Sequence, residues 1–203
     1  MFKLIDSIAW RAIVKSNKSI KITRGFTLLE LMVALTIVSI LAGIAIPNFN
    51  DFIVKMRVDN EIYHLHRMLL IARNAAINHG QKTILCPLDN GSQCTTQWQN
   101  ELSVFTDFNN NKILDANEKI IIKRPTITKD DELIYGKGRN KVTFKPTGQL
   151  SGLANGTFRY CPKDYENHSR GIIVARSGRI YQSSDIDHDG LDENRGNKEI
   201  HCN

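Results

Sequence analysis

The sequence predicts an α+β protein in which one long N-terminal helix packs on an antiparallel β-sheet domain. An apolar run of 21 residues, 26–46, is followed by a segment whose apolar residues recur every three or four positions up to residue 79. After Gly80, short runs with a period of two are separated by Gly, Pro, Asn and Asp clusters, as in strands. An antiparallel sheet needs a cover for its apolar face, and the second part of the helix is the one candidate.

The apolar run is long enough to cross a membrane. A helix of this length spans about 30 Å, the thickness of the hydrocarbon core of a bilayer. We therefore expect residues 26–47 to form a single transmembrane segment. Residues 1–25 hold six basic residues and one acidic residue, a positive flank that stays cytoplasmic. The run carries one formal charge, Glu30, and an unpaired charge in hydrocarbon usually marks a functional residue.

Residues 48–80 are expected to continue the helix as an amphipathic segment. Pro47 lacks an N–H group, so it loosens or kinks the helix without having to end it. His79 and Gly80 are expected to end it, because a basic side chain suits the negative end of the helix dipole and glycine adopts positive φ. The apolar face of this segment is predicted to consist of Phe52, Met56, Val58, Ile62, Leu65, Leu69, Ala72 and Ala76.

Residues 81–203 are expected to form a β-rich globular domain. Ser177 and Gly178 between the last two apolar runs predict a tight hairpin turn. The predicted strands are 83–86, 102–106, 119–123, 133–135, 141–145, 157–160, 171–175 and 179–182.

Four cysteines follow the apolar run, and an even number in a domain outside the cytoplasm predicts disulfides. Four cysteines permit three pairings. We favour Cys86 with Cys94, which closes a short local loop, and Cys161 with Cys202, which ties the end of the chain to the sheet. Zinc is the alternative, but no Cys-x-x-Cys spacing is present.

The formal net charge of +6 is unevenly distributed. Removal of residues 1–25 leaves a charge of about +1, and residues 119–179 then form a basic block between two acidic ones. The block is interpreted either as a solvated sheet face or as a surface that neutralises DNA phosphates without reading sequence. The candidates for DNA contact are Lys137, Arg139, Lys141, Lys145, Arg176 and Arg179.

Two acidic loops resemble the spacing of calcium ligands. In the first, Asp185, Asp187 and Asp189 alternate before Gly190, and Glu193 is placed to complete the shell of one hard cation. The alternative for this loop is an acidic solvated tail. In the second loop, from Asp107 to Glu118, Lys112 takes the position where a calcium loop needs glycine, so we expect a hairpin whose Asn side chains bond their own backbone.

The sequence contains no catalytic constellation, since no histidine has a Ser or Cys arranged as a nucleophile beside it. We therefore expect a protein that is not an enzyme and that requires no cofactor, with Ca²⁺ as a candidate ligand.

The stretch Gly25-Phe26-Thr27-Leu28-Leu29-Glu30, with the later Pro47, resembles the class III leader and first helix of type IV pilins and type II secretion pseudopilins. The resemblance implies that residues 1–25 are a leader, which prepilin peptidase removes by cutting between Gly25 and Phe26. It also implies N-methylation of Phe26. In the filament, the Glu30 carboxylate would pair with the amino terminus of a neighbouring subunit.

Motifs in the β-rich domain resemble the FimT/FimU/GspH branch of these families. The implied function is that of a minor type IV pilin, which initiates pilus assembly near the tip together with other minor pilins and the major pilin. Such a protein lies in the inner membrane through one span and then in the cell-surface pilus, with its soluble domain periplasmic or extracellular. The alternatives are a DNA-binding minor pilin for natural transformation, or a GspH-like pseudopilin of type II secretion. The motifs that carry the resemblance are Trp98, residues 104–111, Asp115, Glu118, residues 144–148 and residues 177–179.

Overall fold

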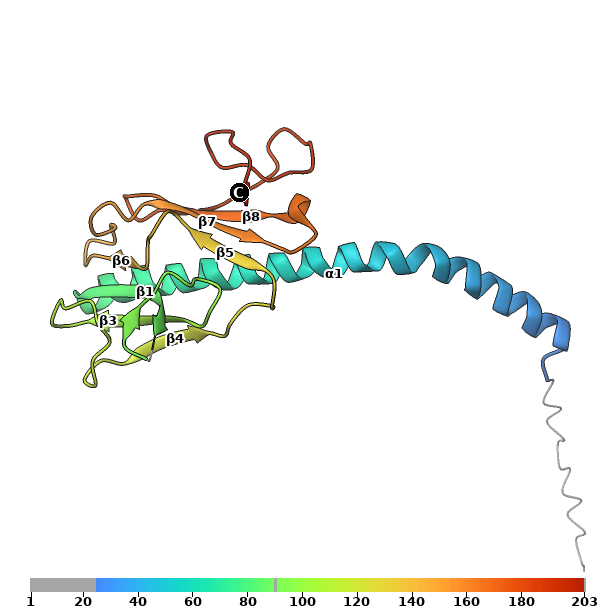
Figure 1. Ribbon diagram of the computed structural model, residues 1–203, viewed down its shortest axis with the longest axis horizontal. Coiled ribbons are helices and arrows are strands. Elements are labelled where there is room, and N and C mark those ends of the chain that lie inside the picture. Colours follow the sequence, from blue (N-terminus) through green and yellow to red (C-terminus); the bar gives the residue numbers. More distant parts are fainter. Residues whose placement is uncertain (1–24, 90, 203) are drawn as a thin grey trace, which may run out of the picture. The chain divides into compact units, whose positions relative to one another are not determined.

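The computed structural model describes residues 25–89 and 91–202, so the predicted leader lies outside the described residues except for Gly25 (Figure 1). The described chain divides into two compact units, with the boundary between Ile44 and Ala45. The first unit contains the beginning of the helix, and the second contains the rest of the helix and all strands.

The helix α1 runs from Leu28 to His79, a length of 52 residues. Its backbone is helical through position 47, so the proline there does not end the helix. The helix ends directly before Gly80 with His79 in its last turn, which confirms the predicted end.

The strands form two antiparallel sheets, where the sequence led us to expect one. The first sheet has the order β2-β1-β3-β4, with β6 also paired to β1, and the second has the order β5-β7-β8-β9. Periodicity identifies strands but not their partners, because pairing is decided by contacts between segments far apart in the sequence. The eight predicted strands are present, and the short strand β2 and a 3₁₀ turn, η1, were not predicted. The bounds are β1 Lys82–Asp89, β2 Gln93–Cys94, β3 Leu102–Asp107, β4 Ile120–Arg124, β5 Glu132–Tyr135, β6 Val142–Phe144, β7 Gly156–Cys161, η1 Glu166–His168, β8 Arg170–Val174 and β9 Ile180–Gln182.

One core cluster joins α1 to both sheets within the second unit. Figure 1 shows the C-terminal part of α1 running along both sheets. The predicted buried face is wrong at two positions, because Phe52 is 55% exposed and Met56 is 53% exposed. A step of two residues in a helix turns the side chain by about 200°, so positions 52 and 56 face away from a stripe that begins at Val54. The stripe consists of Val54, Val58, Ile62, Leu65, Met68, Leu69, Ala72 and Ala76.

Three aromatic rings form the centre of this core. Tyr135 stacks on Phe158 with ring centroids 3.9 Å apart, and Trp98 meets both rings edge-on at 5.3 and 5.0 Å. The Trp98 indole donates to the carbonyl of Arg139 at 2.7 Å, and the Tyr135 hydroxyl donates to the carbonyl of Ala154. Burial raises the pKa of Tyr135 to about 12, so this hydroxyl remains a donor across the physiological range.

The two disulfides join Cys86 to Cys94 and Cys161 to Cys202. This is the pairing favoured from the sequence. The second bond closes a separation of 41 residues and ties the end of the chain to β7. In the chain-entropy model, a loop of that size restricts the unfolded state by about 4 kcal/mol.

A buried carboxylate connects α1 to the second sheet. Arg57 on α1 contacts Asp131 through Nε at 3.0 Å and through a second guanidinium nitrogen at 3.2 Å. The Tyr160 hydroxyl on β7 donates to the same carboxylate at 2.7 Å, and the backbone N–H of Lys163 donates at 3.0 Å. Burial and this contact with Asp131 raise the pKa of Tyr160, which keeps the hydroxyl protonated.

We predict that Asp131→Asn lowers the free energy of unfolding by about 2–3 kcal/mol, because the partly buried Arg57 guanidinium loses the charge of its buried partner. The measurement is urea unfolding of a fragment that begins at residue 50. Asp130→Asn is the matched control, since the exposed Asp130 pairs with the exposed Lys163 at 3.7 Å, and it should cost less than about 1 kcal/mol. Equal effects of the two changes would contradict the role given to Asp131.

Candidate assembly site

The N-terminal part of α1 is apolar and uncovered. Residues 28–46 have a mean hydropathy of 2.4, and within the described chain this is the one helical stretch long and apolar enough to cross a membrane. None of this stretch is buried inside the protein, and Phe26, just before the helix, is 88% exposed. Such a surface needs lipid or other apolar helices around it.

The hydroxyl groups in this stretch are satisfied by the helix itself. Thr36 donates to the carbonyls of Met32 and Val33 at 3.1 and 2.8 Å. Ser39 donates to the carbonyl of Leu35 at 2.8 Å. These hydroxyls therefore add little to the free energy of placing the stretch in an apolar environment. The stretch carries one charged side chain, Glu30.

Glu30 closes the N-terminus of α1 in a capping box with Thr27. The Glu30 carboxylate accepts hydrogen bonds from the backbone N–H and the hydroxyl of Thr27, both at 3.1 Å. In return, the Thr27 hydroxyl oxygen accepts the backbone N–H of Glu30 at 3.2 Å. Both bonds to Glu30 end on Oε2, and the carboxylate lies at the positive end of the helix dipole.

Sequence reasoning singled out Glu30 and missed Thr27. The signal was present, because Thr-x-x-Glu directly before an apolar run is the pattern of a capping box. The cap gives Glu30 a local structural role in addition to the assembly role implied by resemblance. It also holds the carboxylate at the first turn, within a few residues of Gly25 and Phe26.

The candidate DNA contacts fall into two groups. Lys137, Arg139 and Lys141 lie between β5 and β6, where Arg139 is half-buried with its guanidinium 5.9 Å from the centroid of the Tyr135 ring. Burial, together with the nearby Lys112, lowers the pKa of Lys141. Arg139 and Lys141 are therefore less available to a phosphate backbone than their charges suggest, whereas Lys137 is exposed.

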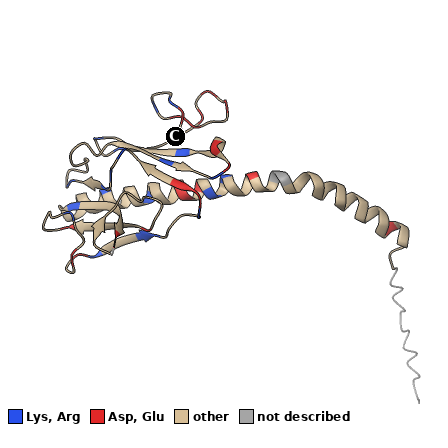
Figure 2. Ribbon diagram, viewed as in Figure 1, with Lys and Arg blue, Asp and Glu red and all other residues tan. Residues whose placement is uncertain are grey.

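The second group is more exposed. Lys145 begins a turn that packs against the β8–β9 hairpin, since the backbone N–H of Leu150 donates to the carbonyl of Arg176 at 3.1 Å. A Cβ at Gly178 would meet the carbonyl oxygen of Gly148 at 1.8 Å, so only glycine permits this approach. Lys145, Arg176 and Arg179 are exposed around this contact, and Figure 2 shows how the basic and acidic residues are distributed.

The four carboxylates proposed for a cation, Asp185, Asp187, Asp189 and Glu193, are brought together. One oxygen from each lies within 4.8 Å of the others, the one such group of three or more acidic, His or Cys ligands in the described residues. The loop between β3 and β4 instead bonds to itself: Glu118 accepts the backbone N–H groups of Phe108 and Asp115 at 2.8 and 3.2 Å.

An apolar helix with one carboxylate in its first turn, followed by a disulfide-bonded α+β domain, defines a type IV pilin-like subunit. A model of the family described as type II transport protein GspH matches residues 62–178, which is more than half of the chain, and the chain belongs to this family. The prokaryotic N-terminal methylation motif matches residues 20–46. Together they identify a member of the minor pilins and pseudopilins, which are structural subunits rather than enzymes.

A solved structure has the same fold. The type IV minor pilin FimU of Pseudomonas aeruginosa superposes with a TM-score of 0.51 at 18% identity, covering 63% of this chain and 88% of FimU. The match confirms the predicted α+β class, with a long N-terminal helix on antiparallel sheet.

Curated relatives match over a short part of the chain. A fimbrial protein of Pseudomonas aeruginosa is 35% identical over 57 residues, which is 28% of this chain and 37% of the relative. The type IV major pilin protein PilE of Neisseria gonorrhoeae is 35% identical over 69 residues, which is 34% of this chain and 39% of the relative. The chain thus covers less than two fifths of these relatives' length.

We predict that Thr27→Val weakens the first turn of α1 by about 1 kcal/mol, because the hydroxyl that caps it is lost. Hydrogen exchange at the Glu30 amide, measured in detergent micelles, should become about fivefold faster. Thr36→Val is the matched control, since its hydroxyl bonds to helix carbonyls and caps nothing, and it should leave this exchange unchanged. An unchanged rate in Thr27→Val would show that the cap does not hold the turn.

Proposed function

We propose that this protein is a minor type IV pilin that takes part in the initiation of pilus assembly at the tip. Prepilin peptidase cuts it between Gly25 and Phe26 and methylates the new terminus, and the inner membrane holds it until assembly. The observation that carries the proposal is the uncovered apolar part of α1 with its single carboxylate at the N-terminal end.

The apolar surface has two environments in this proposal. In the membrane, lipid covers it. In the filament, the equivalent helices of the major pilin and other minor pilins cover it, so extraction from the membrane exchanges one apolar surrounding for another. The exchange costs little for the apolar side chains, and the charged carboxylate is the group that decides where the helix fits.

Glu30 sets the position of the chain in the filament. A carboxylate among packed apolar helices is costly unless an opposite charge pairs with it. The cut would create a positive amino group on Phe26, and in a filament the amine of a neighbouring subunit would reach Glu30. The capping box supports this role, because it holds Glu30 at the first turn with only Oε2 used by the cap.

A pseudopilin of type II secretion is the alternative filament subunit. The family model carries the name of a type II transport protein, whereas FimU is a minor pilin and the curated relatives are fimbrial proteins. Deletion of the gene distinguishes a minor pilin from a secretion pseudopilin. Loss of surface pili with intact secretion supports the minor pilin, and loss of secretion with intact pili overturns it.

We predict that Glu30→Gln leaves processing intact and lowers incorporation into pili at least tenfold. Glutamine keeps an oxygen that can accept the Thr27 hydrogen bonds, so the change removes the charge and spares the cap. Processing is measured by the mobility of the cut chain, and incorporation by immunoblot of sheared pili. Thr27→Val is the complementary control, because it removes the cap and keeps the charge. Wild-type incorporation of Glu30→Gln would contradict charge pairing in assembly.

Duplex DNA is a second candidate partner, and the observation that favours it is the exposed group of Lys145, Arg176 and Arg179 around the packed turns. Such a group would contact phosphates without reading bases, so its affinity would fall steeply with salt.

For DNA we predict that replacing Lys145, Arg176 and Arg179 together by Gln lowers the affinity for duplex at least tenfold at low salt. The slope of log affinity against log salt concentration should fall by about 3, one unit for each lost phosphate contact. A gel shift with the fragment from residue 50 measures both. The control is the triple change of the exposed Lys119, Lys129 and Lys198 to Gln, and equal losses in the two variants would show that only net charge matters.

A further inference from the structure

We propose that the loop from Asp185 to Glu193 binds one calcium ion. Asp185, Asp187, Asp189 and Glu193 each place a carboxylate oxygen so that all four lie within 4.8 Å of one another. Calcium binds oxygen at about 2.3–2.6 Å, so ligands on opposite sides of the ion lie about 5 Å apart. Four oxygens with these separations fit the shell of one ion.

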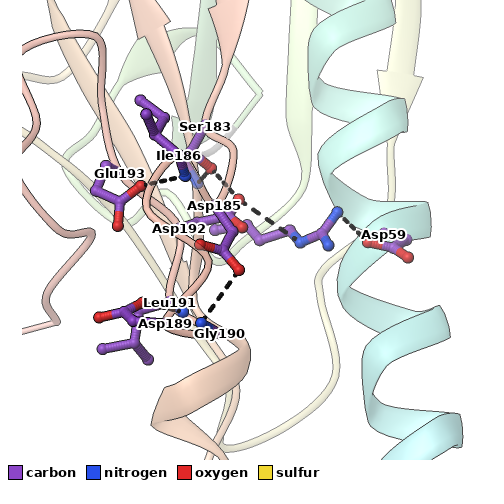
Figure 3. A network of polar contacts seen from close by, with 11 residues as sticks. Asp59, Ser183, Asp185, Ile186, Asp189, Gly190, Leu191, Asp192 and Glu193 are labelled. Carbon is purple, nitrogen blue, oxygen red and sulfur yellow. Dashed lines mark hydrogen bonds and ion pairs between the residues drawn. The ribbon is translucent and has the colours of Figure 1, made fainter.

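Figure 3 shows the carboxylates of Asp185, Asp189 and Glu193 turned toward a common space. The loop backbone holds them there. Asp185 accepts the backbone N–H groups of His188 and Gly190 at 2.7 and 3.1 Å, and Asp189 accepts that of Leu191 at 2.8 Å. Gly190 has φ +94°, a conformation that side chains rarely adopt, and this turn brings the alternate carboxylates onto one side of the loop.

Glu193 gives a second, independent observation that points to a cation. The residue is 4% exposed. Its Oε2 accepts the backbone N–H of Ile186 at 2.7 Å, whereas Oε1 is buried without a hydrogen-bond partner in the described part of the chain. A buried carboxylate oxygen without a partner is unfavourable, and it becomes more so beside other carboxylates.

The backbone prevents Glu193 from turning out into water. Its N–H donates to the carbonyl of Ser184 at 3.0 Å, and its carbonyl accepts the N–H of Ser184 at 3.2 Å. Residue 193 is thereby paired with 184 on one side and with 199 on the other. The buried carboxylate is a fixed part of the loop, so a bound cation would satisfy its Oε1.

Two arginines close to the loop have other contacts. Arg170 contacts Asp59 on α1 at 2.5 Å and Asp192 at 3.7 Å. The Arg195 guanidinium lies 3.6 Å from the centroid of the Tyr181 ring. Among the described residues, none of the four proposed ligands forms a salt bridge. Their mutual repulsion is left for a bound cation to relieve.

The donor set selects calcium. All four ligands are hard oxygen atoms, which excludes a preference for zinc or copper. Magnesium dehydrates reluctantly and is rarely held by several protein carboxylates at once, whereas calcium accepts six to eight oxygens in a flexible arrangement. Backbone carbonyls or water would fill the remaining positions, since Asp187 and Asp189 are exposed.

The ion would fasten the C-terminal end of the chain. The loop is already connected to β8 and α1 through Asp192 and Arg170, and the Cys161–Cys202 bond anchors the tail nine residues beyond Glu193. Calcium would add a link within the segment between these anchors. It would act on the stability of the folded domain, and its binding does not depend on filament assembly.

The test is calcium binding by the full chain in detergent micelles after removal of metal with a chelator. We expect one ion per chain by isothermal titration calorimetry and a rise of several degrees in melting temperature at 2 mM CaCl₂. Glu193→Gln and Asp187→Asn should each weaken calcium binding at least tenfold. In metal-free buffer Glu193→Gln should melt no lower than wild type, because it removes one repelling charge.

Asp164→Asn is the matched control. Asp164 is an exposed acid outside the loop, and its positive φ of 62° is one that asparagine tolerates, so the change removes the same charge without strain. It should leave the calcium affinity unchanged. No binding heat and no change in melting temperature at 2 mM calcium would overturn the site, as would wild-type affinity in Glu193→Gln. Equal affinity for MgCl₂ would overturn the assignment to calcium.

Discussion

The folded domain depends on the burial of one stripe of α1, from Val54 to Ala76, against two sheets at once. Residues of both sheets pack against this stripe in one cluster, so the stripe is the common surface of the core. Polar contacts then fix the elements on it: Asp131 joins Arg57 on α1 to Tyr160 on β7. A one-residue shift of α1 would misplace both the stripe and this contact, which is why the helix has a single register on the sheets.

Two glutamates show how the surroundings of a carboxylate determine what it can do. Glu30 is exposed, bonded to Thr27 in the capping box and placed at the positive end of a helix, so it is stable in the single chain and still accessible to a second partner. Glu193 is buried with one oxygen unpartnered, so it is incomplete in the single chain. The first suits a contact between subunits, and the second suits a ligand that enters the fold.

Much of the fold could be predicted from the sequence because the relevant signals are local. The change of period at Gly80, the apolar run after Phe26 and the alternate aspartates before Gly190 each lie within a short stretch, and each predicts its element directly. Phe52 and Met56 were misplaced because their four-residue spacing fits a helical pattern, although the two-residue step to Val58 places them on the opposite face from the stripe. The division into two sheets was missed because strand partners are set by contacts between distant segments.

The sequence by itself determined the class of protein, since the apolar run, Glu30 and the methylation motif are read residue by residue. It also indicated the acidic loop and the cysteine pairing, because loop length and spacing limit which ligands and thiols can meet. Only the tertiary structure decided that Glu193 is buried with Oε1 unpartnered, that Arg139 lies beside an aromatic core and that Asp131 joins helix to sheet. Burial and charge pairing depend on what the rest of the chain brings alongside, and no local pattern records that.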